Sequence, residues 1–214
     1  MSNDPPLETI AGRRVLFTMA TTAEFGSELK RRFTPLMVGV GPVEAGIGTA
    51  RALAQLRSRG QPADLVVSLG SAGSRTLHET AVYQAASVSY RDMDASPLGF
   101  AKGETPFLGL AAVIEAPARI PEVPSARLST GARIVSGSHY DDIDADMVDM
   151  ESYAVLRAAM LAGSAFIGLR GISDGRAPLK GAGDWLRFLH VIDANLAAVV
   201  DRMSGWIESG GLGR

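Results

Sequence analysis

The chain contains no cysteine and only three histidines among its 214 residues. Without cysteine it can have no disulfide framework, no thiolate nucleophile and no cysteine-ligated metal. The histidines, at positions 78, 139 and 190, lie too far apart in the sequence to suggest a histidine-rich metal site. No apolar run approaches the roughly 20 residues that a membrane-spanning helix needs, and residues 1–6 lack the pattern of a secretory signal. These absences favour a cytoplasmic enzyme.

An excess of either charge is also missing, because 21 basic residues stand against 23 acidic ones. The resulting net charge of −2 argues against a general nucleic-acid binder. Hydrophobic residues make up 46% of the chain, and its length allows one substantial core. We therefore expect a single domain over residues 13–207, with a loosely ordered N-terminus at 1–12 and a frayed C-terminus at 208–214.

Short apolar segments alternate with segments of helical periodicity along most of the chain. Strands are predicted at 15–19, 36–40, 64–69, 83–90, 132–136 and 165–170, and helices at 42–59, 150–161 and 185–206. Glycine and proline are frequent from 92 to 124, which predicts a long loop with one short helix near 108–113. The alternation predicts an α/β fold, a single three-layer α/β/α domain with a mostly parallel mixed central sheet.

Carboxylates and glycines gather at the ends of these predicted strands. Glu151 begins a predicted helix, Asp174 follows an apolar strand, and Gly70-Ser71-Ala72-Gly73 closes another. Open α/β sheets build their sites at such strand ends. Each motif also has a structural explanation, since an acid at a helix start complements the helix dipole and Asp-Gly is a common turn pair.

The chain resembles the nucleoside phosphorylase/nucleosidase superfamily, and most closely its 5′-methylthioadenosine/S-adenosylhomocysteine nucleosidase branch. The resemblance spans residues 15–200 and is carried by the Gly70 motif, by Val148-Asp149-Met150-Glu151-Ser152 and by Leu169-Arg170-Gly171-Ile172-Ser173-Asp174. It implies that Glu151 bridges the ribose hydroxyls and helps to stabilise positive charge as the glycosidic bond breaks. Asp174 would protonate or hydrogen-bond N7 of the departing adenine.

The resemblance implies further roles around the same site. Glu24 would position and deprotonate the attacking water, although the preceding Met19-Ala20-Thr21-Thr22-Ala23 departs from the family pattern. A solvated helix face is the structural alternative for Glu24, and Glu28 is a substitute base. The implied substrate-binding residues are Met150 on the sugar face, Ser71 under the sugar, Tyr140 stacked on adenine, Val40 lining the pocket, Trp185 covering the 5′ substituent (or lying in the core), and Arg170 and Ser173 orienting the carboxylates.

Water, rather than phosphate, is the expected second substrate. Phosphorolytic members of the family place an arginine two positions before Gly70, where this chain has Ser68. A phosphate dianion requires charge-assisted donors. We therefore expect a homodimer that hydrolyses a 5′-substituted adenine nucleoside without a cofactor or a metal, binding neither nucleic acid nor membrane. Loop 97–107 would reach into the neighbouring subunit's 5′ pocket. The alternatives are another adenosine derivative (futalosine, 5′-deoxyadenosine or a lipid-linked adenosine), a phosphorylase, and a non-catalytic nucleoside sensor.

Overall fold

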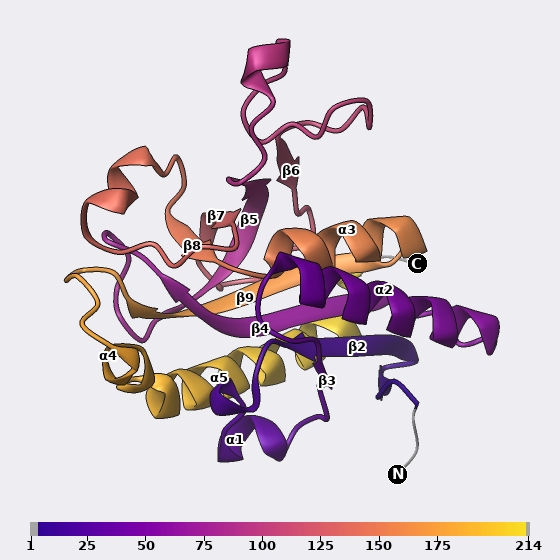
Figure 1. Ribbon diagram of the computed structural model, residues 1–214. Coiled ribbons are helices and arrows are strands. Elements are labelled where there is room, and N and C mark those ends of the chain that lie inside the picture. Colours follow the sequence, from indigo (N-terminus) through magenta and orange to yellow (C-terminus); the bar gives the residue numbers. More distant parts are fainter. Residues whose placement is uncertain (1–3, 213–214) are drawn as a thin grey trace.

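The computed structural model describes residues 4–212 (Figure 1). The strands are β1 (Glu8–Ile10), β2 (Arg13–Met19), β3 (Leu36–Met37), β4 (Leu65–Gly73), β5 (Val82–Tyr90), β6 (Val113–Glu115), β7 (Ser125–Thr130), β8 (Met147–Asp149) and β9 (Ala165–Asp174). The helices are α1 (Ser27–Lys30), α2 (Pro42–Ser58), α3 (Ser152–Ala162), α4 (Ala182–Leu186) and α5 (Leu189–Glu208), with 3₁₀ turns η1 (Thr22–Glu24), η2 (Ser96–Leu98) and η3 (Gly137–Asp142). Within residues 4–212, every helix is too short or too polar to cross a bilayer.

The strands form one mixed sheet whose centre is parallel, as predicted. β4 pairs in parallel with β2 on one side and with β9 on the other. β5 runs antiparallel to β9 and parallel to β7. β8 continues from β7 in parallel and meets the end of β4, where Gly73 pairs with Val148. The ends of β4, β8 and β9 therefore converge, and Gly73 of β4 lies next to Val148 and Asp174, which come much later in the sequence.

Helices cover both faces of the sheet, which confirms the three-layer architecture (Figure 1). Successive strand residues point to opposite faces, so a strand buried on both sides is apolar throughout. In β2, Leu16 packs into the core under α2 and α3, whereas Phe17 packs into the core under α1 and α5. Val66 and Val67 of β4 divide in the same way.

Several strand boundaries differ from the prediction. β4 does not end in a glycine turn at residue 69 but continues through Gly73, with an irregularity in its pairing with β9 at Ala72 and Gly73. β9 likewise runs to Asp174. These extensions lie where the two strands pair with each other, so tertiary pairing overrides the local glycine signal. The strand predicted at 36–40 is shorter, because only Leu36 and Met37 pair with β2.

The middle of the chain holds the largest errors of prediction. The strand predicted at 132–136 is wrong, because the pairing segment is β7 at 125–130. The apolar run that suggested it instead buries Val135 in a small cluster with Tyr140 and Val148. The short helix near 108–113 is also absent, and β6 begins at Val113. β8 was not predicted, since its three residues are too few to show a period.

The C-terminal helix predicted at 185–206 is divided into two. α4 ends at Leu186, and α5 begins at Leu189 after a break at Arg187 and Phe188. The break places Trp185 on the short α4 rather than on the long helix. At the other end of the chain, β1 pairs antiparallel with β2. The expectations for 1–12 and 208–214 fall in part on residues 1–3 and 213–214, which lie outside the described residues.

Candidate active site

A cleft of about 640 Å³ opens where the ends of β4, β8 and β9 converge. Residues from the first loop, from the start of α3 and from α4 complete its walls. The residues that line it are Ala20, Thr21, Glu24, Val40, Ser71, Ala72, Gly73, Arg91, Arg133, Ile134, Val135, Tyr140, Val148, Asp149, Met150, Glu151, Ser173, Asp174, Leu179, Lys180, Gly181, Ala182 and Trp185. Three glutamate and aspartate side chains proposed for chemistry, at positions 24, 151 and 174, therefore share one cavity. Its volume suits a small molecule.

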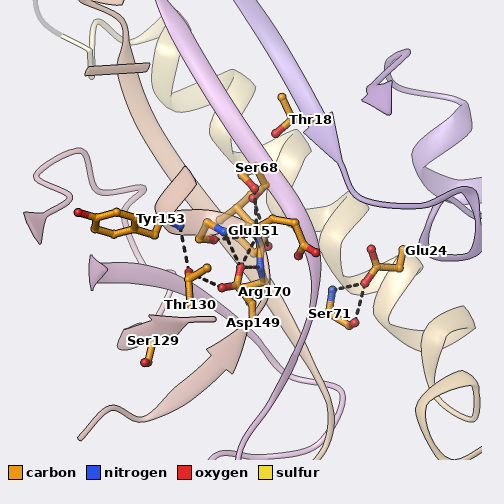
Figure 2. A network of polar contacts seen from close by, with 12 residues as sticks. Thr18, Glu24, Ser68, Ser71, Ser129, Thr130, Asp149, Glu151, Tyr153 and Arg170 are labelled. Atoms are coloured by element: carbon orange, nitrogen blue, oxygen red, sulfur yellow. Dashed lines mark hydrogen bonds and ion pairs between the residues drawn. The ribbon is translucent and has the colours of Figure 1, made fainter. Parts of the chain in front are cut away.

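Glu24 lies at the end of η1 and is 9% exposed. Its Oε1 accepts a hydrogen bond from the Ser71 backbone N–H at 2.8 Å and another from Ser71 Oγ at 2.6 Å (Figure 2). Trp185 Nε1 donates to the same Ser71 Oγ at 2.8 Å. Burial raises the pKa of Glu24 above its usual value, and the two bonds from Ser71 oppose that rise. A carboxylate whose pKa is raised by burial is a better proton acceptor than an exposed one.

The two glycines of the Gly70-Ser71-Ala72-Gly73 motif allow functional side chains to lie against the backbone of β4. A Cβ atom at Gly70 would lie 3.2 Å from Glu24 Oε2, which is tighter than an ordinary contact. A Cβ atom at Gly73 would overlap the hydroxyl of Tyr140. Glycine is therefore needed in this motif because side chains approach the backbone closely, and not because the chain turns there.

Glu151 occupies the position just before α3, and its Oε1 accepts a hydrogen bond from the backbone N–H of Gly41 at 2.8 Å. Gly41 has a φ of 94°, a conformation that favours glycine. Burial and the nearby Asp149 carboxylate raise the pKa of Glu151 to about 7. The side chain therefore changes charge within the physiological range.

A buried ion pair lies behind Glu151 (Figure 2). Arg170 donates to Asp149 Oδ2 from Nε at 3.0 Å and from Nη2 at 2.8 Å, and both side chains are nearly inaccessible to solvent. Asp149 also accepts from Thr130 Oγ1 and from the backbone N–H of Ser152. Burial alone would raise the pKa of Asp149, but the Arg170 charge and these donors hold it below its usual value. The network fixes the turn that presents Met150 and Glu151 to the cleft.

Asp174 ends β9 and also lines the cleft. Ser173 Oγ donates to its Oδ1 at 2.5 Å. Burial raises the pKa of Asp174, and the bond from Ser173 opposes the rise. Tyr140 lies nearby, because a Cβ at Gly73 would contact both its hydroxyl and Asp174 Oδ2. The buried Tyr140 hydroxyl has no hydrogen-bond partner within residues 4–212, and burial raises its pKa, so it is available as a donor to a ligand.

The structure brings together every predicted site residue except one. Those that line the cleft are Glu24, Val40, Ser71, Tyr140, Met150, Glu151, Ser173, Asp174 and Trp185. Arg170 does not line it; this residue is 2% exposed and contacts Asp149 rather than Glu151 or Asp174. Glu28 also lies away from the cleft and pairs with Arg31 and Arg32 on the surface.

Three cationic residues of the cleft were not predicted. Arg91 follows β5 and donates to the carbonyls of Asp149, Gly131 and Arg133, among others. Arg133 and Lys180 are exposed at the rim. Only Arg91 had a sequence signal, as a charged residue directly after a strand. The other two lie in irregular segments, whose path the sequence did not reveal.

The cleft lies at the ends of the strands and is lined by buried carboxylates. This is the usual location of the ligand site in an open α/β fold. The profile of the Phosphorylase superfamily matches residues 7–204, so this chain belongs to that family. No curated protein matches its sequence.

Solved structures share the fold at low sequence identity. A 5′-methylthioadenosine/S-adenosylhomocysteine nucleosidase from Neisseria meningitidis, in complex with methylthio-immucillin-A, has a TM-score of 0.71 and 21% identity over 91% of this chain and 98% of that one. The corresponding enzyme from Colwellia psychrerythraea, in complex with adenine, gives 0.73 and 19% over 93% and 96%. A futalosine hydrolase mutant from Helicobacter pylori gives 0.74 and 18% over 89% and 98%.

Proposed function

We propose that the protein hydrolyses the N-glycosidic bond of a 5′-substituted adenine nucleoside, of the methylthioadenosine or S-adenosylhomocysteine type, and releases adenine. The observation that carries this proposal is the convergence of Glu24, Glu151 and Asp174 on one cleft, each with a raised pKa. Membership of the Phosphorylase superfamily supports it. So do the nucleosidases that share the fold.

Each carboxyl group has a distinct task in this mechanism. Glu24 accepts a proton from water as the water attacks the anomeric carbon. Glu151 accepts hydrogen bonds from the ribose hydroxyls, and its charge stabilises the positive charge that develops on the sugar. Asp174 donates a proton to N7 of the purine, so that adenine leaves as a neutral base, or a hydrogen bond that stabilises the departing adenine anion. Tyr140 stacks on the base, and Met150 packs on the sugar.

Phosphorolysis is the second candidate, because cationic residues do line the cleft. The position where phosphorylases carry an arginine is Ser68, which is buried and accepts a hydrogen bond from Arg170. The two terminal nitrogens of Arg91 donate hydrogen bonds to backbone carbonyls. Arg133 and Lys180 remain at the rim, where they could meet an anion. Hydrolysis is favoured because this chain has Ser68 where phosphorylases have the arginine that binds phosphate.

Adenine release from methylthioadenosine, S-adenosylhomocysteine and 5′-deoxyadenosine, with and without phosphate, tests the proposal. Release in phosphate-free buffer supports hydrolysis, and the fastest substrate identifies the 5′ group. Release that depends on phosphate would establish the phosphorylase instead. Tight nucleoside binding without release would establish a sensor. Futalosine and a lipid-linked adenosine extend the series, because Val40, Ile134, Leu179 and Trp185 give the cleft an apolar wall.

We expect kcat/KM to rise as the pH increases through about 7, because Glu151 must be ionised to hold the ribose.

The raised pKa of Glu151 also makes the stability of the protein depend on pH. The folded protein favours the protonated side chain, so stability is highest below the ordinary pKa of 4.5 and falls as the pH rises from there through about 7. Glu151→Gln should therefore abolish most activity yet stabilise the protein at pH 8 by about 1–2 kcal/mol, allowing for partial solvent screening. Urea titration of this variant measures the gain.

Glu44→Gln is the control for that experiment, because Glu44 is an exposed acid near the start of α2. It should change neither the pH profile nor the stability beyond about 0.5 kcal/mol. A Glu151→Gln protein that is less stable than the parent at pH 8 would contradict the assignment.

We also propose that the protein is a homodimer. Apolar side chains are exposed on α2, where Val43 and Ile47 are 67% and 60% exposed. Others lie on the segment that protrudes from the body between β5 and β6, where Phe107 is 92% exposed (Figure 1). Such a concentration is typical of an interface.

The double substitution Val43→Glu and Ile47→Glu should convert the dimer to a monomer in sedimentation velocity experiments, because the charges would be buried at the interface. Leu186→Glu is the control and should leave the dimer intact, because Leu186 is an exposed apolar residue on α4, on the other face of the sheet from α2 (Figure 1). A parent protein that sediments as a monomer at micromolar concentration would overturn the proposal.

A further inference from the structure

Three side chains from distant parts of the chain form a line of hydrogen bonds along one wall of the cleft. Trp185 of α4 donates to Ser71 Oγ of β4 at 2.8 Å, and Ser71 Oγ donates to Oε1 of Glu24 at 2.6 Å. The indole N–H of Trp185 has no role in the chemical steps proposed above, in which Trp185 contributes only to the apolar wall of the cleft.

The hydrogen-bonding groups of tryptophan and serine determine which of them donates in each bond. An indole N–H can only donate, whereas a serine hydroxyl has one proton to donate and two lone pairs that accept. When Trp185 donates to Ser71 Oγ, it occupies one of those lone pairs, and the hydroxyl proton is free to point to Glu24. The Ser71 backbone N–H adds a second donor to the same carboxylate oxygen. Two donors on one oxygen stabilise the ionised form of Glu24.

The surroundings of Glu24 make these donors important. Burial acts against its charge. Arg170 of β9 favours the charge from behind the wall, while Asp149 of β8 opposes it and Glu151 repels it across the cleft. Within residues 4–212, both hydrogen bonds to the carboxylate come from Ser71.

We propose that Trp185 is a positioning residue for the hydrolytic step: its indole N–H orients the Ser71 hydroxyl toward Glu24 and so maintains Glu24 as the acceptor that water activation requires. This inference rests on the proposed function. It assigns to the indole nitrogen a task that phenylalanine, with a ring but no N–H, could not perform.

Trp185→Phe tests the inference, because it keeps an aromatic cover and removes the donor. The test uses the acidic limb of the kcat profile, which reports Glu24 in the enzyme–substrate complex, where the ribose hydroxyls hold Glu151 ionised. Trp185→Phe should move this limb to higher pH by about one unit, a tenfold loss on that side. Above the limb the loss should be smaller, because Glu24 is then ionised without help. KM for the nucleoside should change by less than about threefold. Ser71→Ala should shift the limb at least as far.

A second measurement observes the contact without turnover. In protein carrying Trp206→Phe, which removes the other tryptophan, the indole ¹H–¹⁵N resonance belongs to Trp185. Trp206 lies on α5 away from the cleft, so the parent profile should be retained. The Trp185 resonance should shift as Glu24 ionises, and this titration should vanish when Glu24→Gln is added.

The two measurements separate the two proposals. Turnover with a shifted limb in Trp185→Phe and a titrating indole resonance supports the positioning role. Turnover with an unshifted limb, or with a resonance that ignores Glu24, overturns that role and leaves the hydrolase intact. Absence of turnover in the parent protein overturns the proposed function, and with it any role of Trp185 in a reaction.

Discussion

Replacing Glu24 with glutamine is expected to reduce kcat by about two to four orders of magnitude, the usual contribution of a general base. Glutamine has the same shape, and its amide oxygen can still accept both hydrogen bonds that Ser71 donates to Oε1. It cannot accept a proton from water. The loss should therefore fall on kcat, while KM for the nucleoside should change little. Adenine release in phosphate-free buffer, followed over a range of substrate concentrations, measures both constants.

Glu28→Gln provides a matched control, since it makes the same chemical change four residues later. The Glu28 side chain pairs with Arg31 and Arg32 on the surface of the protein and does not line the cleft. This variant should keep kcat within about twofold of the parent. If Glu28→Gln instead removed activity, or if Glu24→Gln retained it, Glu24 would not be the base. Equally negligible turnover in the parent and both variants would favour a nucleoside sensor.

Short apolar runs and the helical spacing of apolar residues predicted the central elements of the fold correctly. The strand at 15–19, the strand at 83–90 and the helix at 42–59 lie almost where the sequence placed them. The strand at 15–19 is an uninterrupted apolar run because both of its faces are buried, whereas the helix is long enough to show its own period. The strand predicted at 132–136 failed because Val135 is buried by neighbouring loop residues rather than by a sheet partner.

The location of the site could be predicted from the order of the strands and from the motifs at their ends. Residues at the ends of β4 and β9 had to meet, because the two strands are parallel neighbours. The sequence could not show that Arg170 points away from the cleft, because a strand end does not determine which face a side chain takes once the strand is extended. It also could not show that Trp185 contacts Ser71, which depends on the break between α4 and α5.

Asp149 has a structural role that the sequence motif around it did not predict. It stands beside the Met150–Glu151 pair in the sequence, yet it is the side chain on which the buried network centres. Because α3 has no side-chain cap from the residue that precedes it, Asp149 and Thr130 supply acceptors for its first backbone N–H groups. The residue that binds the ribose in our proposal is thus fixed by neighbours that never touch the ligand.

The network leads to the second large effect that we expect. Arg170→Met should reduce the free energy of unfolding by about 3–5 kcal/mol, because it leaves the buried Asp149 carboxylate without its cation. The same substitution at Arg202, whose pair with Glu122 is exposed, should cost less than about 1 kcal/mol. Urea unfolding at pH 7 measures both.

The dependence of that cost on pH identifies its cause. The pKa of Asp149 is lowered in the native protein, so its contribution to stability is present above its usual value of 3.8 and is lost as the pH falls through the lowered native value. In Arg170→Met, burial is no longer opposed by the Arg170 charge, so Asp149 should take up a proton at a higher pH than in the parent. The difference in stability between parent and variant should therefore narrow as the solution is acidified. A difference that stays constant would assign the loss to packing of the Arg170 side chain rather than to charge.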